Sequence, residues 1–239
     1  MTAWRIDCAP AVIEAASHGL LVSEWVGGGD LRREFRPQDT VEVARLLSTL
    51  HTCGLPWSGM IDPLARLDLY LSLARPTEGS AMATAEDLRR LRPALIELAE
   101  HLAATPAAVG PCHGDPWPGN LVGSARRMWL IDWEYSGVGD QAWDLATFAL
   151  EAGLDTAATS DLISAYYSAG GAAEVTEARV AAQMPLCDAI WSAWGLLQNA
   201  HRGGSTDFVD YSARRIDHCR RRLRALSEVS PISLHGPAG

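Results

Sequence analysis

Hydrophobic residues near the start of the chain fall into two short runs on either side of a turn. The runs are Ala11 to Ala16 and Leu20 to Val26, and Ser17-His18-Gly19 separates them. Two hydrophobic runs bounded by turn residues predict a pair of β-strands. The glycines Gly27-Gly28-Gly29 follow the second run and predict a loop.

Beyond this loop the hydrophobic spacing becomes helical. Thr40 is expected to cap a helix that ends near Gly54. Asp62-Pro63 opens a second helix, because proline is favoured at the first helical position. A third helix is expected over residues 84–104, interrupted at Pro93. The apolar positions of the first two helices include Val41, Ala44, Leu46, Leu47, Leu50, Leu64, Leu67, Leu71 and Leu73.

The next segment of the chain is not expected to form a helix or an ordinary strand. Residues 112–122, CHGDPWPGNLV, hold two prolines and two glycines among polar residues. Two β-like runs, Asn120 to Val122 and Met128 to Ile131, surround a turn near Gly123-Ser124. At least three more helices are expected over residues 140–226.

The composition is that of an ordinary globular domain with an acidic balance. The 239 residues are 48% hydrophobic, the net charge is −9, and all 20 basic residues are arginine. An acidic chain argues against nucleic acid as a partner. The five cysteines form no C-x-x-C pair, and no apolar stretch reaches the roughly 18 residues that span a bilayer. These features predict a cytoplasmic protein with no membrane partner.

Four polar residues in and after the proline-glycine segment carry the candidate chemistry. His113, Asp115 and Asn120 lie within the segment, and Asp132 follows the apolar run 128–131. Loops held by strands can bring such side chains together. The oxygens of Asn120 and Asp132 are of the kind that Mg²⁺ binds, and Asp115 could accept a proton from an alcohol. This division of roles is what phosphoryl transfer requires.

The motif His113-x-Asp115-x-x-x-x-Asn120, followed by Ile131-Asp132-Trp133-Glu134, resembles the catalytic and metal-binding loops of the aminoglycoside phosphotransferase family. Within that family, LIDWEYSGVGDQAWDLA at residues 130–146 is most similar to the choline, ethanolamine and thiamine kinases. The resemblance implies an α+β fold: a mostly helical, protein-kinase-like C-terminal lobe with a small β-hairpin at the active site. The implied divisions are 1–29 for a two-strand remnant of the N-terminal lobe and a hinge, 30–230 for the C-terminal lobe, and 231–239 for a loose tail.

The resemblance also implies roles for individual residues. Asp115 would be the base or orienting carboxylate for an acceptor hydroxyl, and His113 would brace the catalytic loop. Asn120 and Asp132 would hold Mg²⁺ beside ATP.

The same resemblance places a hinge for the adenine of ATP at Glu24, Trp25 and Val26. A glycine-rich loop and a strand lysine should precede this hinge, but only 18 residues precede Gly19 and the chain has no lysine. Three explanations stay open: a misplaced gene start or a truncated gene, a partner chain that supplies the lobe, or a fold kept for binding or for a different reaction.

The acceptor is left open by the sequence. Glu134, Trp117 and Trp191 are candidates for binding it, because carboxylates and aromatic faces hold organic cations. Asp188 would also suit a cationic acceptor. The helical spacing of Trp191 from Trp194 is more typical of a hydrophobic core than of a ligand site.

Two further carboxylates have a structural interpretation. Asp140 precedes a helical run and Asp144 lies in its first turn, so both are interpreted as helix caps or dipole partners rather than site residues.

The leading hypothesis is an enzyme that moves the ATP γ-phosphate to a hydroxyl of a small molecule such as choline, thiamine or an aminoglycoside. The alternative is a catalytically inactive pseudokinase-like binding protein, or a C-terminal subunit that needs a partner lobe. A nucleotide-independent hydrolase has little support, because no serine or cysteine nucleophile lies at a recognisable elbow.

Overall fold

The computed structural model describes residues 8–15, 21–27, 29–30, 36, 39–76, 78–124, 127–202 and 206–229. The chain forms two compact units, each made of two segments. The first unit comprises Met1–Ile61 and Ala107–Val180, and the second comprises Asp62–Pro106 and Ala181–Gly239. The whole of the proline-glycine segment belongs to the first unit.

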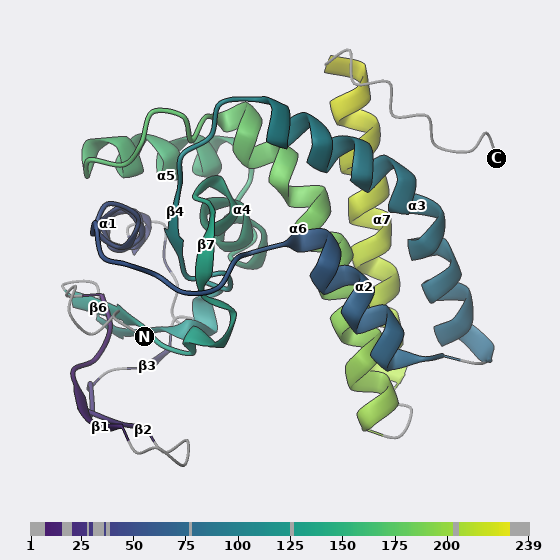
Figure 1. Ribbon diagram of the computed structural model, residues 1–239, viewed down its shortest axis with the longest axis horizontal. Helices are drawn as coiled ribbons and strands as arrows, with labels where there is room; N and C mark the ends of the chain where they lie inside the picture. The colour runs from purple at the N-terminus through teal and green to yellow at the C-terminus, as the bar shows by residue number, and fades with distance from the viewer. Residues whose placement is uncertain are drawn as a thin grey trace. The chain divides into compact units, whose positions relative to one another are not determined.

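The first unit combines short antiparallel strands with helices. The strands are β1 (Val12–Ala15), β2 (Leu21–Ser23), β3 (Gly29–Asp30), β4 (Val109–Cys112), β5 (Leu121–Ser124), β6 (Arg127–Leu130) and β7 (Gly137–Asp140). The helices are α1 (Thr40–His51), α4 (Ala142–Glu151), α5 (Thr156–Ser168) and the 3₁₀ turns η3 (Pro118–Asn120) and η4 (Trp133–Tyr135). The strands form the pair β1-β2, the sheet β3-β5-β6 and the pair β4-β7, and α1, α4 and α5 lie around the last pair (Figure 1).

Helix α1 buries one stripe of side chains within the first unit. Asp39, not Thr40, is its N-cap residue. Val41 is 65% exposed, whereas Val43 is fully buried. The expectation for Val41 was wrong because Val43, four residues before Leu47, continues the buried stripe at helical spacing and Val41 lies off it. The buried residues of α1 are Thr40, Val43, Ala44, Leu46, Leu47, Ser48, Leu50 and His51.

The predicted hairpins are present, but two other strand pairings among the described residues were not predicted. β1 pairs with β2, and β5 pairs with β6, both antiparallel. The turn at Ser17-His18-Gly19 lies outside the described residues. One is β3 with β5, in which Gly29, expected in a loop, lies opposite Gly123. The other is β4 with β7, in which Cys112 is opposite Gly137. Their sequences, VGPC and GVGD, are rich in glycine and proline and carry no strand pattern, so tertiary pairing creates these strands.

The second unit is helical in its described residues. Its elements are α2 (Pro63–Ala74), α3 (Gly79–Ala104), α7 (Thr206–Val229) and most of α6 (Glu177–His201). Asp62 caps α2 as predicted, since its carboxylate accepts the Ala65 N–H at 2.9 Å. Helix α3 begins at Gly79, not at residue 84, and continues through Pro93 without the predicted interruption. Leu73 of α2, expected on the apolar face, is half exposed.

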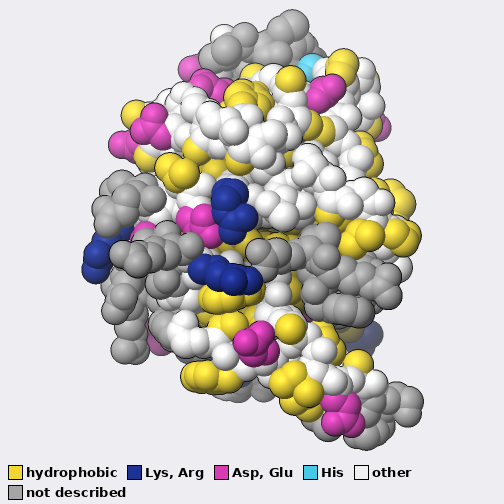
Figure 2. Space-filling view, turned by 90° about the vertical axis from the view of Figure 1, so that its left-hand side faces the viewer, with side chains coloured by type: hydrophobic (Ala, Val, Ile, Leu, Met, Phe, Trp, Pro, Cys, Tyr) yellow, Lys and Arg dark blue, Asp and Glu magenta, His cyan; other side chains and the backbone are white. Residues whose placement is uncertain are grey.

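Some hydrophobic side chains remain at the surface. Figure 2 shows them in several separate places on the face that it draws. In the first unit Ile13 and Leu21 of the β1-β2 pair and Trp25 after it are exposed, Trp25 by 89%. Among the described residues, no helix combines the length and the apolar character needed to cross a bilayer.

Candidate active site

The proline-glycine segment forms a loop between two strands of different sheets. Strand β4 ends at Cys112, the loop follows, and the turn η3 leads from Pro118 to Asn120 and directly into β5. Gly114 has φ +85°, and a β-carbon at this position would collide with the Tyr135 carbonyl oxygen. A glycine is therefore required at this point of the loop.

Helix α4 holds the start of this loop through two consecutive side chains. The Asp144 carboxylate accepts the backbone N–H of His113 at 2.7 Å and that of Gly114 at 2.9 Å. The Trp143 indole N–H donates to the Gly114 carbonyl at 3.0 Å. Asp144 and Trp143 are both buried. These bonds fix the backbone of His113 and Gly114, the two residues that directly precede the candidate base, Asp115.

His113 connects the loop to the strand that precedes Asp132. Its Nε2 lies 2.9 Å from the Ile131 carbonyl oxygen, and its Nδ1 accepts the Asp115 N–H at 3.3 Å. The first contact requires a proton on Nε2 and the second a lone pair on Nδ1, so the ring is neutral. Burial lowers the pKa of His113 in agreement with this tautomer. His113 therefore braces the loop from inside the protein.

Asp115 and Asn120 meet at the mouth of the loop. The Asn120 amide donates through Nδ2 to the Asp115 carbonyl oxygen at 3.0 Å and to its carboxylate at 3.4 Å. The backbone carbonyl oxygen of Asn120 accepts the backbone N–H of Ile131 at 3.0 Å. Because the donor atoms of the amide face Asp115, its oxygen Oδ1 is the atom that can bind a cation.

Asp132 directly follows Ile131, the residue that bonds to Asn120. It is exposed and has left-handed backbone angles, φ 61° and ψ 68°, between β6 and η4. This conformation is uncommon for a residue with a side chain and is more frequent in loops that carry function. The bonds of Ile131 to His113 and Asn120 place Asp132 next to both ends of the loop. An exposed carboxylate and an amide oxygen fit the oxygen ligands of Mg²⁺.

The predicted hinge, Glu24 to Val26, leads toward the β3-β5-β6 sheet. Glu24 donates its backbone N–H to the Ala11 carbonyl at 2.7 Å, and the side chains of Glu24 and Trp25 are exposed while that of Val26 is half-buried. The chain then enters β3, which pairs with β5. Since β5 begins directly after Asn120, the hinge segment leads into the sheet that carries the candidate metal ligand.

The candidate acceptor residues occupy different places. Trp117 lies with its indole against Gly119, where a β-carbon would overlap the ring. Glu134 is exposed, two residues after Asp132. Trp191 belongs to the second unit, where it is 6% exposed and packs edge-to-face against Trp194, so its assignment to an acceptor site stays a prediction.

Asp188 is not available to a cationic acceptor. It is fully buried in the second unit, where Arg215 pairs with its carboxylate at 3.1 Å and Arg222 at 2.5 Å. Two guanidinium groups already supply the opposite charge, so the expectation for Asp188 was wrong.

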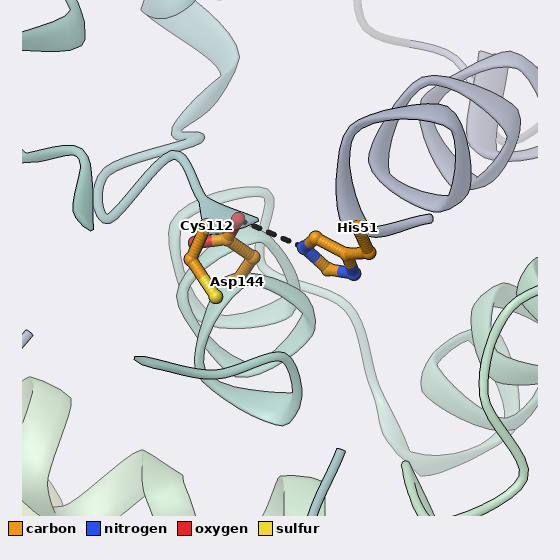
Figure 3. A group of neighbouring side chains, drawn as sticks. All are labelled: His51, Cys112 and Asp144. Atoms are coloured by element: carbon orange, nitrogen blue, oxygen red, sulfur yellow. Dashed lines mark hydrogen bonds and ion pairs between the residues drawn. The ribbon is translucent and has the colours of Figure 1, made fainter. Parts of the chain in front are cut away.

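Two residues behind the loop were missed from the sequence as parts of the site. Asp144 does lie in the first turn of α4, but its carboxylate binds the loop instead of only meeting the helix dipole. His51, at the end of α1, lies beside Asp144 and Cys112, and the three ligand-type atoms are within 4.8 Å of one another (Figure 3). These atoms are already engaged in hydrogen bonds, so we describe the group as a junction between elements and not as a metal site. A signal was present, since a histidine on the buried face of a helix needs a polar partner.

Gln141, not Asp140, is the N-cap residue of α4, so the predicted cap was wrong by one residue, although the Asp140 side chain still binds the start of the helix and also makes an ion pair. Its carboxylate accepts the Ala142 N–H at 3.1 Å at the start of α4. The other carboxylate oxygen lies 2.7 Å from Nε of Arg179, and both side chains are largely buried.

The sequence profile of the phosphotransferase enzyme family (APH) matches residues 8–182. The chain belongs to this family. The matched residues include the hinge, the loop at 113–120 and Asp132. The resemblance predicted from the motif is confirmed.

Known proteins of this family resemble the chain in sequence and in structure. Thiamine kinase from Escherichia coli is 37% identical over 145 residues, which are 59% of this chain and 49% of that protein. A choline/ethanolamine kinase family protein from Mesorhizobium loti has a TM-score of 0.76 and 28% identity, covering 98% of this chain and 79% of that one. LicA in complex with AMP has a TM-score of 0.74 and 25% identity, covering 93% and 75%.

These similarities confirm the predicted fold class, an α+β fold with kinase-like relatives. The chain spans about half the length of the curated relatives that it matches.

Proposed function

We propose that this phosphotransferase moves the γ-phosphate of ATP to a hydroxyl group of a small organic molecule. The observation that supports this most directly is the hydrogen-bonded loop in which Asp115 meets Asn120 while Ile131, next to Asp132, bonds to the same loop. In the proposed site, Asp115 would supply the base, Asn120 the amide oxygen and Asp132 the carboxylate at one end of the β5-β6 hairpin. Phosphoryl transfer depends on positioning of this kind more than on covalent chemistry.

Asp115 is the proposed base. Asp115 as a residue is half-buried, which leaves room for an acceptor hydroxyl to approach it, and its backbone is held by the bonds to His113 and Asn120. A carboxylate in this position accepts the hydroxyl proton as the oxygen attacks the phosphorus.

Asn120 and Asp132 are the proposed ligands of Mg²⁺. When bound, the ion would neutralise charge on the phosphates of ATP. The chain's own contribution is to hold the amide oxygen and the carboxylate in place, through the bond of Asn120 to Asp115 and the left-handed backbone at Asp132.

The hinge at Glu24, Trp25 and Val26 is the proposed adenine contact, made by its backbone. The complex of LicA with AMP supports an adenine nucleotide as the ligand of this fold. The reaction is proposed to take place in the cytoplasm.

The acceptor class is proposed from the relatives and from the side chains near the loop. Choline, thiamine and aminoglycosides all carry a hydroxyl and a positive charge. Glu134 and Trp117 are two described side chains of the first unit that could receive such a charge, Glu134 by ion pairing and Trp117 through its aromatic face.

Two measurements test this proposal. The first is thermal unfolding of the whole chain with and without ATP and Mg²⁺, where a nucleotide site predicts stabilisation that grows with ligand concentration. The second is phosphate transfer to choline, thiamine and an aminoglycoside, in which Asp115→Asn should lower kcat about 100-fold or more. Asp155→Asn is the matched control, because Asp155 is an exposed cap of α5 and asparagine caps equally well.

The outcomes separate the hypotheses. Stabilisation and transfer that both depend on Asp115 support the enzyme. Stabilisation without transfer to any acceptor, alone or with a co-purified polypeptide, would favour an inactive binding protein, and the absence of both would overturn the proposal.

A further inference from the structure

A chain of buried hydrogen bonds runs behind the His113–Asn120 loop. It joins His51 of α1, Gln141 and Asp144 at the start of α4, and Tyr166 of α5. His51 Nδ1 lies 2.9 Å from the Tyr166 hydroxyl, and Nε2 lies 3.1 Å from Asp144 Oδ2. Gln141 donates through Nε2 to the His51 carbonyl at 3.0 Å, and its Oε1 lies 3.1 Å from the Tyr166 hydroxyl. All four side chains are buried.

The positions of the protons in this series of hydrogen bonds follow from its acceptors. Because Gln141 donates through Nε2, its Oε1 is an acceptor, and the Tyr166 hydroxyl donates to it. The Tyr166 oxygen then accepts from His51, which requires a proton on Nδ1. The Asp144 carboxylate, which already accepts two backbone N–H groups, requires a proton on Nε2. With the Tyr166 proton on Gln141 Oε1, a ring protonated only on Nε2 would set the lone pair of Nδ1 against that of the Tyr166 oxygen, and a ring protonated only on Nδ1 would set Nε2 against the Asp144 carboxylate.

The surroundings of His51 are compatible with a positive charge. Burial raises the pKa of the Cys112 thiol and that of the Tyr166 hydroxyl, so both groups are neutral. The negative charge of Asp140 also helps to raise the pKa of Cys112, but Asp140 forms its own ion pair with Arg179. Asp144 is therefore the anion with which His51 pairs (Figure 3). A fully buried carboxylate is costly unless an opposite charge accompanies it.

We infer that His51 is a positioning residue: it is a doubly protonated imidazolium that keeps Asp144 ionised, and the ionised Asp144 holds the backbone of the catalytic loop at His113 and Gly114. Tyr166 and Gln141 fix this protonation state. Because Asp115 follows Gly114 directly, the charge on His51 determines how well the proposed base is placed. This consequence for catalysis rests on the proposed function, whereas the protonation state does not.

The first test reads the protonation state in the unmodified chain. Long-range ¹H–¹⁵N spectra of histidine side chains distinguish a doubly protonated ring from each neutral tautomer, and His51→Gln identifies the His51 signals by their loss. At about pH 7.5, above the ordinary titration range of histidine, His51 should still carry both protons. A neutral His51 at that pH would overturn the inference, whether or not the chain proves to be a kinase.

The second test removes one support of the charge. Tyr166→Phe deletes the acceptor of the Nδ1 proton, so His51 should lose that proton at about pH 7.5, and kcat should fall about tenfold with little change in KM for ATP. Tyr167→Phe is the matched control, because the neighbouring hydroxyl donates instead to the Val175 carbonyl at 2.7 Å. A merely structural role predicts that both variants leave the His51 signals unchanged. That result, or a retained second proton in Tyr166→Phe, would contradict the inference.

Discussion

The carbonyl oxygen of Tyr135 lies too close to the position that a β-carbon on Gly114 would occupy for both atoms to fit. This contact joins the turn η4, which follows Asp132, to the loop that carries Asp115. The geometry of the two halves of the site therefore depends on the absence of one side chain.

Gly114→Ala should destabilise the protein and remove activity together. The positive φ alone costs about 1–2 kcal/mol for a residue with a β-carbon, and the collision with Tyr135 adds to this cost. Gly170→Ala isolates the first effect, because Gly170 has φ +92° and open space around its Cα. Urea unfolding of both variants should show the larger loss in free energy of unfolding for Gly114→Ala; equal losses would mean that the Tyr135 contact is soft.

Asp144→Asn should lower the free energy of unfolding by roughly 2–4 kcal/mol. The amide is nearly the same size as the carboxylate. In the variant, however, its NH₂ group would face the backbone N–H of His113 or Gly114, which in the native protein donates to a carboxylate oxygen of Asp144. One buried donor then loses its acceptor. Asp155→Asn provides the comparison, since its exposed cap tolerates the same change; chemical denaturation of the pair measures the difference, and a loss below about 1 kcal/mol would show that the loop does not need this acceptor.

Asn120→Ala should weaken the binding of Mg²⁺ without removing the base. The loss of the Oδ1 ligand should raise the Mg²⁺ concentration needed for half-maximal activity about tenfold or more, and excess Mg²⁺ should restore part of the rate. Asp115→Asn should not be restored in this way. Titration of turnover with Mg²⁺ separates the two variants, and equal rescue of both would remove the assigned division of roles.

The stability of the protein should depend on pH through His113. Burial lowers the pKa of His113 in the folded state, so the unfolded chain takes up a proton near its ordinary value of about 6.5 while the folded chain does not. The free energy of unfolding should therefore fall as the pH drops below about 6.5, by at most about 1.4 kcal/mol per pH unit for this group. His113→Gln should flatten the slope between about pH 5 and pH 6.5, whereas the exposed His101→Gln should leave it as it is.

Trp117 should contribute to binding a cationic acceptor but not ATP. If the aromatic face receives the cation, Trp117→Leu should raise KM for that acceptor by about 3- to 30-fold, corresponding to about 0.5–2 kcal/mol. KM for ATP serves as the internal control. Equal changes in both KM values would indicate a distorted loop instead of a lost cation–π contact.

Much of the architecture follows from local sequence patterns. Asp62 with Pro63, and the hydrophobic runs of β5 and β6, carry enough local preference to fix a helix start and a hairpin. The spacing from His113 to Asp132 likewise identifies the family, because phosphoryl transfer restricts which residue types can stand at those positions. Val41 and Leu73 show the limit of such patterns, since several apolar residues on one helix compete for a single buried stripe.

The sequence by itself indicated which side chains could do chemistry: a carboxylate and an amide in a segment that two prolines and two glycines keep out of regular structure, and a second carboxylate directly after the apolar run 128–131. Only the tertiary structure decided what holds that loop. Strands β4 and β7 exist because they pair with each other, and Asp144 and His51 meet although 93 residues separate them. The physical reason is that a buried polar group must find its partner wherever the fold brings one, and distance along the chain does not reveal that partner.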